Sequence, residues 1–194
     1  MKKFFALVLA MLMVLSLAAC GGQTNDDGTT PDDGNIPAEK TSIVFASGGT
    51  SGTYYAVGGT IPTVLNNKLT LSNITVEATS ASKANVNMIT DGDAQMAILQ
   101  SDVLAYAHGG SNTFAETGVE DTALWVVGVY PEHVQFFAQP GITGVEDLRG
   151  KTVVVGDVGS GTEVNARQIF EAYGMTFDDI NAVNGSFALA AESI

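Results

Sequence analysis

A short apolar strand that runs directly into a glycine-rich turn and then into a helix most constrains how this chain can fold. Residues 42–55 read SIVFASGGTSGTYY, with four apolar residues at 43–46 and turn formers at 48–53. From Tyr54 onward, apolar side chains recur at three- and four-residue steps, which is the period of a helix. Such a junction presents backbone N–H groups and hydroxyls at a helix N-terminus, where the helix dipole favours an anion.

A second copy of the same junction lies about a hundred residues downstream. Residues 151–155 read KTVVV, residues 156–161 form a second glycine-rich turn, and a helix is predicted from Thr162 to Gly174. Two such turns facing each other would form a cleft lined by amides and hydroxyls. We therefore expect a small organic anion to bind between them.

The order of predicted elements indicates the fold class. Strands alternate with helices, which predicts an α/β fold with a largely parallel sheet and ligands beyond the carboxyl ends of its strands. Pro62 lies inside the first predicted helix and predicts a kink or an early end there. The predicted strands are 42–46, 73–79, 94–99, 123–130, 134–138 and 152–155, and the predicted helices are 54–67, 83–90, 103–108 and 162–173, with a helical turn at 145–148 and a helix start at 187–191.

Composition and charge exclude several classes of protein. The 194 residues carry a formal net charge of −13 with 45% apolar residues, so the chain can bury a core but has no basic stripe for nucleic acid. A single cysteine excludes an internal disulfide and argues against a thiolate metal site. His108 and His133 are far apart and are interpreted as ordinary surface or loop residues, and no cofactor is expected.

The first forty residues predict export and a membrane anchor. Residues 1–20 have two lysines, an apolar run too short to span a bilayer, and the sequence LAAC, which has the form of a lipoprotein signal peptide with Cys20 as the acylated residue. A plain secretory signal is the alternative. Residues 21–40 are acidic and almost free of apolar side chains, which predicts a flexible tether between the membrane and the folded part.

Tests for enzyme motifs leave one enzymatic alternative. Neither Ser51 nor Ser160 has the two glycines of a nucleophile elbow, and neither glycine turn has a Walker lysine or dinucleotide-binding spacing. A secreted serine hydrolase using one of these serines remains the alternative function, and a surface interaction protein without a small ligand is the third. Each glycine turn can also be purely structural, because glycine supplies positive φ.

An ordered set of short motifs resembles a known family. The segments GGTSGTYY at 48–55, SKAN at 82–85, LQSD at 99–102, YPE at 130–132, LRGK at 148–151 and VGDVGSGTE at 155–163 are similar to those of TAXI-type solute receptors of TRAP transporters. The resemblance implies a two-lobed periplasmic-binding-protein fold of the second type, which closes over a small solute such as glutamate. It also implies a TRAP-type membrane permease as the partner.

The resemblance also implies domain bounds and ligand contacts. Residues 41–133 would form the first lobe and residues 134–194 a shortened second lobe, so that a truncated receptor is expected. Lys83 is the better candidate among the cations for a carboxylate partner, and Tyr130 for a hinge or lid. The implied ligand-binding residues are Thr50, Ser51, Gly52, Tyr54, Tyr55, Ser82, Asn85, Gln100, Ser101, Tyr130, Ser160, Gly161 and Thr162.

Overall fold

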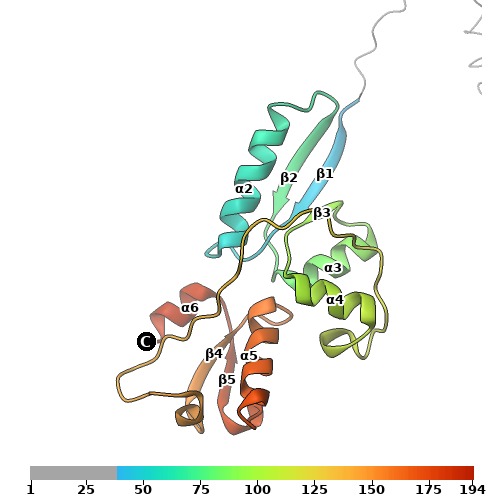
Figure 1. Ribbon diagram of the computed structural model, residues 1–194. Coiled ribbons are helices and arrows are strands. Elements are labelled where there is room, and N and C mark those ends of the chain that lie inside the picture. The colour runs from blue at the N-terminus through green and yellow to red at the C-terminus, as the bar shows by residue number, and fades with distance from the viewer. Residues whose placement is uncertain (1–38) are drawn as a thin grey trace, which may run out of the picture. The chain divides into compact units, whose positions relative to one another are not determined.

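The computed structural model describes residues 39–194, and the predicted signal peptide, Cys20 and nearly all of the predicted tether lie outside the described residues. Helices and parallel strands alternate along the chain, which confirms the predicted α/β fold (Figure 1). The elements are β1 (Thr41–Ala46), α2 (Thr53–Asn66), β2 (Ser72–Glu77), α3 (Ser82–Asp91), β3 (Met96–Ala97), α4 (Ser101–Gly109), η1 (Asn112–Phe114), η2 (Val145–Leu148), β4 (Thr152–Gly156), α5 (Gly161–Ala172), η3 (Phe177–Asp179), β5 (Asn181–Asn184) and α6 (Phe187–Glu192).

The first sheet has the order β2-β1-β3, and both pairings are parallel. Phe45, Ile74 and Ile98 are buried between this sheet and α2. Helix α2 approaches the end of β1 closely, since a Cβ on Gly58 would lie 2.9 Å from the Ser47 Cβ. The glycine therefore lets the helix lie against the strand that leads into the first glycine-rich turn.

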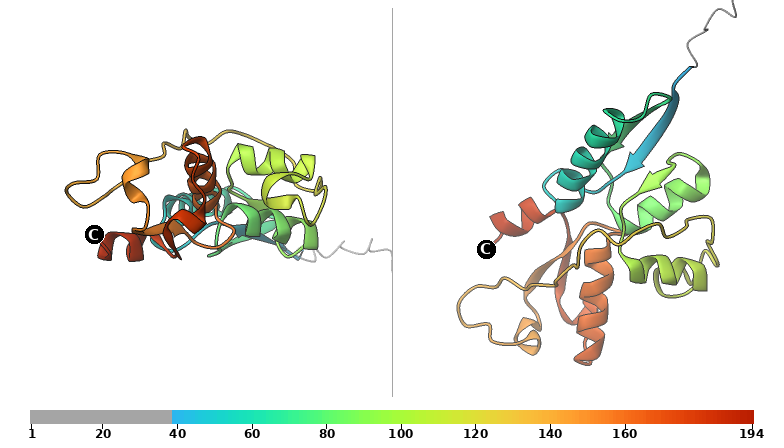
Figure 2. Two further views of the ribbon diagram at one scale, coloured as in Figure 1. Left: turned by 90° about the horizontal axis from the view of Figure 1, so that it is seen from below. Right: turned by 45° about the horizontal axis from the view of Figure 1, so that its top comes forward.

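The second sheet pairs β4 with β5 in parallel, and α5 lies along it (Figures 1 and 2). Phe170 and Met175 are fully buried beneath it together with Val155. Strand β5 was not predicted. Its two central residues are only half-buried, so its sequence, NAVN, has a weak hydrophobic signal.

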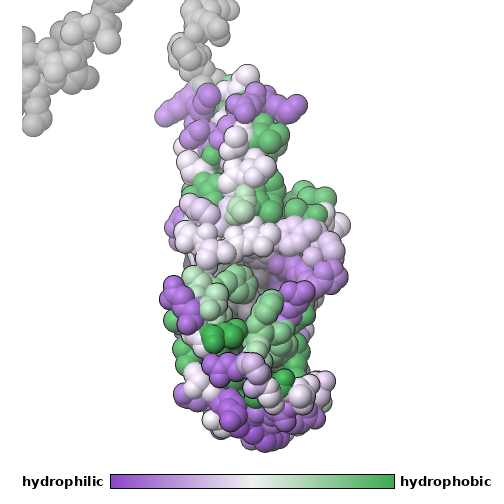
Figure 3. All heavy atoms as spheres, turned by 90° about the vertical axis from the view of Figure 1, so that its left-hand side faces the viewer, coloured by the Kyte–Doolittle hydropathy of each residue, from purple (hydrophilic) through white to green (hydrophobic). Residues whose placement is uncertain are grey.

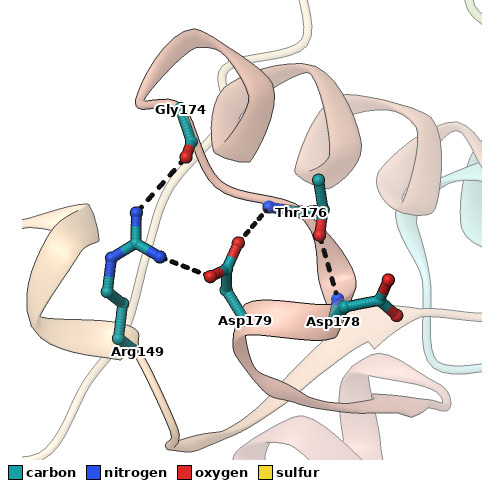
Figure 4. A network of polar contacts seen from close by, with 5 residues as sticks. All are labelled: Arg149, Gly174, Thr176, Asp178 and Asp179. Atoms are coloured by element: carbon teal, nitrogen blue, oxygen red, sulfur yellow. Dashed lines mark hydrogen bonds and ion pairs between the residues drawn. The ribbon is translucent and has the colours of Figure 1, made fainter.

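A polar network closes the far end of this second sheet (Figure 4). Arg149 forms an ion pair with Asp179 Oδ1 and donates to the Gly174 carbonyl at 3.3 Å. The other oxygen of Asp179 accepts from the Thr176 N–H at 2.8 Å, which caps η3. Arg149 is thus paired, although about half of its side chain stays exposed.

One core cluster is shared by α5, which packs on the second sheet, and by α3, α4 and η1, which follow strands of the first sheet. Val86 from α3, Val103 from α4 and Phe114 from η1 are buried with Val164 from α5. The Gln168 side chain donates to the Tyr106 hydroxyl at 2.6 Å on the same side. The division into lobes at residues 133 and 134 stays a prediction.

The predicted strands at 123–130 and 134–138 are wrong. Both segments are extended chain without strand pairing, and Figure 1 draws them as a long trace between α4 and β4. A strand needs a neighbour to accept its backbone hydrogen bonds, and none lies beside these residues in the part of the chain described. The apolar side chains consequently face solvent, with Val126 85% exposed.

Pro62 does not have the effect predicted from the sequence, and the starts of α3 and α4 are joined by a hydrogen bond. Helix α2 continues through Pro62 without a break, because the proline is buried in a 14-residue helix packed on β1 and β2. Ser82 is the first residue of α3, and its hydroxyl accepts from the Gln100 N–H at 3.2 Å. Gln100 holds the cap position of α4.

Candidate functional site

The two glycine-rich turns lie in one cavity of about 440 Å³. The first turn follows β1 and leads into α2, and the second follows β4 and leads into α5, so both are at the carboxyl ends of parallel strands. The predicted residues that line this cavity are Ser51, Gly52, Tyr54, Ser82, Gln100, Tyr130, Ser160, Gly161 and Thr162.

Four predicted residues do not line the cavity: Thr50, Tyr55, Asn85 and Ser101. Thr50, Tyr55 and Ser101 are exposed to solvent elsewhere on their turn or helix.

Asn85 is fully buried and all of its side-chain contacts are with the protein. Its Nδ2 donates to the carbonyls of Ser47 and Ile98, both at 2.7 Å, and its Oδ1 accepts from the Thr79 hydroxyl at 2.6 Å. The amide therefore ties together the ends of β1 and β3 and the loop before α3. Its role is to position the cavity wall, since no polar atom of it is free for a ligand.

Four helices of the described chain, α2, α3, α5 and α6, begin at the cavity, and two of them, α2 and α5, follow the glycine-rich turns. Gly52 caps α2 and Ser160 caps α5, and the first helical residues of both helices are among the lining. The N–H groups in the first turn of a helix have no partner within that helix. Helix α2 has no acidic residue in its first turn and no side-chain cap, so its positive end is open to an anion.

The turn before α5 requires its glycines. Gly156 has φ of +100°, and a Cβ there would lie 2.8 Å from both Ser160 Oγ and Thr162 Cβ. Gly161 lies directly against the side-chain amide of Gln100, leaving no room for a side chain. Only glycine at these positions allows the start of α5 to approach Gln100 in the cavity.

The wall of the cavity beside α2 contains a tyrosine paired with a carboxylate. The Tyr54 hydroxyl donates to Glu132 Oε2 at 2.9 Å. Burial and then the adjacent Glu132 charge raise the pKa of the Tyr54 phenol well above its ordinary value. The same two causes, in the same order, raise the pKa of Tyr130. Both phenols are therefore neutral hydrogen-bonding groups at physiological pH.

Two polar atoms in the cavity wall are buried without a partner in the described chain. They are Gln100 Oε1 and the Tyr130 hydroxyl. Buried polar atoms are almost always hydrogen-bonded in native proteins, because an unpaired one costs about 1–3 kcal/mol. A ligand in the cavity would supply the missing partners.

The sequence reasoning missed several lining residues. Glu132 and His133 follow Tyr130, and Ser186 and Phe187 form the start of α6. Asp157 lies inside the second glycine-rich turn, so its position was a signal available from the sequence.

Strain is also present in the wall. Ala81 has φ of 74° and ψ of −140°, a conformation that residues with a side chain rarely adopt. Its N–H donates to the Thr79 hydroxyl at 2.9 Å, and its carbonyl accepts from the Asn85 N–H at 2.9 Å. These bonds hold the loop before α3 in place at the cavity.

The serines lack the contacts of a nucleophile. Ser160 Oγ accepts from the Glu163 N–H at 3.1 Å and so caps α5. His108 Nε2 contacts the Ala123 carbonyl at 2.7 Å. His133 lines the same cavity as Ser160, but no histidine–serine hydrogen bond is formed within residues 39–194.

The cation expected to meet a carboxylate does not line the cavity. Lys83 Nζ donates to the Thr113 carbonyl at 2.7 Å and lies 5.5 Å from the centre of the Phe114 ring. The prediction for Lys83 failed because its long side chain leaves the turn and packs on η1. Among the residues that the structure describes, no lysine or arginine lines the cavity, while Glu132 and Asp157 are both present.

Neither a metal centre nor a membrane span is found in the described part of the chain. No three histidine, cysteine or acidic side chains in residues 39–194 gather to hold a metal ion. None of the helices described there is long and apolar enough to cross a bilayer.

Comparison with known families gives a match that covers nearly all of the described chain. Residues 45–193 match the NMT1-like family. The match includes both glycine-rich turns, every described strand except the first four residues of β1, and every predicted ligand-binding residue. This chain therefore belongs to the NMT1-like family, a family of ligand-binding proteins of the periplasmic-binding-protein type.

Proposed function

We propose that this protein is a lipid-anchored, extracytoplasmic receptor that captures a small organic solute and delivers it to a TRAP-type permease. Membership of a family of binding proteins supports the receptor role. The signal-like segment ending at Cys20 and the acidic residues 21–40 support export and anchoring. The ordered motifs that resemble TAXI-type receptors support the permease partner.

The solute is a zwitterionic amino acid. The observation that carries this proposal is a cavity that receives the uncapped N-terminus of α2 together with two carboxylates, Glu132 and Asp157, while no lysine or arginine of residues 39–194 is in its lining. Amides at helix N-termini stabilise a carboxylate, and the acidic side chains stabilise an ammonium group. A dicarboxylate without an ammonium group would place a second negative charge near Glu132 and Asp157 with no cation to compensate it.

The unpaired polar atoms add specificity to this charge pattern. Gln100 Oε1 needs a donor, and the Tyr130 hydroxyl can donate or accept. An ammonium group supplies up to three donors, so one group can contact both a carboxylate and Gln100 Oε1. Solutes that lack such a donor leave this buried oxygen unpaired.

Thermal unfolding in the presence of candidate solutes tests the proposal. Glutamate, glutamine and neutral amino acids are compared with succinate and with simple amines, because a ligand that binds only the folded state raises Tm. We expect amino acids to stabilise the protein and succinate to have little effect. Stabilisation by succinate alone would contradict the proposed solute class.

Matched variants locate the binding in the cavity. Asp157→Asn and Glu132→Gln remove the negative charges proposed to hold the ammonium group, and Glu171→Gln removes an exposed charge on α5 outside the lining. The first two are expected to lower amino-acid affinity at least about tenfold, a difference of roughly 1.4 kcal/mol. Glu171→Gln should leave it unchanged. Hydrolysis of a generic ester that disappears in Ser160→Ala would instead favour the serine hydrolase.

A further inference from the structure

The start of α5 differs in charge from the other helix starts at the cavity. Helices α2, α3 and α6 have no acidic residue in their first turn, whereas α5 has Glu163 there. The Glu163 N–H donates to the Ser160 hydroxyl at 3.1 Å, and the Glu163 carboxylate turns back to the residue before Ser160. This reciprocal arrangement is close to a capping box, whose carboxylate is stabilised by the positive end of the helix. The protein itself therefore supplies the anion at the start of α5.

Both oxygens of the Glu163 carboxylate have partners. Oε2 accepts from the Gly159 N–H at 2.7 Å, and Oε1 accepts from Arg167 at 2.9 Å. The Arg167 guanidinium also lies 4.1 Å from the centre of the Phe177 ring. Only 13% of the Glu163 side chain is exposed, so salt screens its charge less than that of a surface carboxylate. Glu163 is thus held in one position with its charge close to the first turn of α5.

Gly159, which Glu163 contacts, attaches the second glycine-rich turn to α3. The Gly159 carbonyl accepts from the Lys83 N–H, in the first turn of α3, at 3.0 Å. The φ angle of Gly159 is +75°, a conformation that glycine adopts without strain. Residues 160–162, which follow directly, all line the cavity, although neither Gly159 nor Glu163 does. Glu163 can therefore act on the cavity only through this turn and through its charge.

We propose that Glu163 is a positioning residue that makes the cavity select amino acids with an uncharged side chain over acidic ones. It holds the second glycine-rich turn through Gly159, and its charge takes the place of a second solute carboxylate at the start of α5. This inference rests on the proposed function, in which the cavity binds a zwitterionic amino acid, and extends it to a residue outside the lining. The start of α2, which has no acidic residue and no side-chain cap, is then left for the one carboxylate of the solute.

An acidic side chain on the solute would bring a second negative charge into the cavity. No lysine or arginine of residues 39–194 lines the cavity, and the arginines of that range, Arg149 and Arg167, are already in ion pairs. On the face of the molecule in Figure 3, strongly hydrophilic side chains lie chiefly toward the two ends, with apolar or weakly polar ones between. With the start of α5 neutralised by Glu163, the second carboxylate therefore has no cationic partner in the described chain.

Titration calorimetry with glutamine and glutamate tests the proposal, because these two solutes differ mainly in the charge of the side chain. Glu163→Gln removes the charge but keeps an oxygen that can accept from the Gly159 N–H, and Glu163→Ala removes both. Glu171→Gln, at an exposed position of α5 outside the lining, is the matched control. Thermal unfolding measures the stability of each variant, and amide hydrogen exchange reports on Gly159 with or without a solute.

We expect the unchanged chain and Glu171→Gln to bind glutamine more tightly than glutamate. In Glu163→Gln the ratio of the two dissociation constants should shift toward glutamate by roughly two- to thirtyfold, the effect of one charge at a helix N-terminus. In Glu163→Ala the Gly159 N–H should also exchange about tenfold faster or more, because it has lost a charged acceptor.

An unchanged ratio in Glu163→Gln would overturn the proposal. So would equal losses of affinity for both amino acids together with a lower Tm, since Glu163 would then only stabilise the fold. If neither amino acid binds to the unchanged chain, the proposed function itself fails and this selectivity fails with it. Gly159 exchange that is equally slow in Glu163→Ala and in the unchanged chain would overturn the positioning role, even where no solute binds.

Discussion

Gly161, the first residue of α5, lies against the side-chain amide of Gln100, the residue that caps α4. The contact joins the end of β3 in the first sheet to the helix that follows the second sheet. Because both residues line the cavity, the width of the cavity at this point depends on the absence of a side chain at position 161.

Gly161→Ala should destabilise the protein by about 1–3 kcal/mol, because the new methyl group has no space beside Gln100. Urea unfolding measures the change. In the double variant with Gln100→Ala the destabilisation should fall well below the sum of the two single changes, since the Gln100 side chain no longer blocks the new methyl group.

Gly59→Ala is the control: its Cβ would contact nothing within 4 Å, so a gain of about 0.5–1 kcal/mol is expected. Additive effects of the two cavity changes would show that the contact is unimportant.

Asn85→Ala should cost about 2–5 kcal/mol, because it leaves the buried carbonyls of Ser47 and Ile98 without their donor. Asn87, on the same helix but exposed, is the matched control, and Asn87→Ala should change stability by less than about 0.5 kcal/mol. Both are measured by urea unfolding. Equal effects of the two substitutions would contradict the positioning role of Asn85.

The raised pKa of Tyr54 leads us to expect a loss of stability at alkaline pH. Its pKa is raised in the folded protein, so the phenol binds a proton there that the unfolded chain releases near pH 10. The contribution to stability is complete below about pH 10 and is lost as pH rises above that value. In Tyr54→Phe, the unfolding free energy should fall less steeply between about pH 9 and 11. An unchanged slope in this variant would contradict the assignment.

Arg149 and Asp179, which form an ion pair at the end of the second sheet, should not contribute equally to the free energy of unfolding. Arg149→Ala removes a half-exposed ion pair, so we expect a loss of at most about 1 kcal/mol that shrinks as salt is added. Asp179→Ala also removes the acceptor for the Thr176 N–H, a cap contact worth about 1 kcal/mol more. Thermal unfolding at low and high salt distinguishes the two variants. An Arg149→Ala loss that is larger than that of Asp179→Ala would contradict this order.

Local signals predicted the parts of the fold that lie beside the cavity. Each glycine-rich turn follows an apolar strand and precedes a helix with a clear period, and both junctions are present at the predicted residues. Nine of the predicted ligand-binding residues consequently line one cavity, because parallel strands place their carboxyl ends at the same edge.

The failures have a common physical origin in contacts between distant residues. Residues 123–130 have strand-forming side chains, but a strand forms only where another backbone pairs with it. The polar Asn85 follows a turn like a ligand-binding residue, yet the carbonyls that bind its amide belong to residues 47 and 98. Lys83 likewise binds the Thr113 carbonyl, thirty residues away, and no local pattern indicates that partner.

The burial of Val164 among residues of α3, α4 and η1 limits how a solute can enter. Separating α5 from those helices would expose the shared apolar cluster to water, at a cost of about 1.5–3 kcal/mol for each large side chain uncovered. Entry is therefore expected where the wall is least packed, at Tyr130–His133 and at Phe187, which is 57% exposed. The packing around Val164 should therefore stay intact while a solute binds, and the solute should enter the cavity beside Phe187.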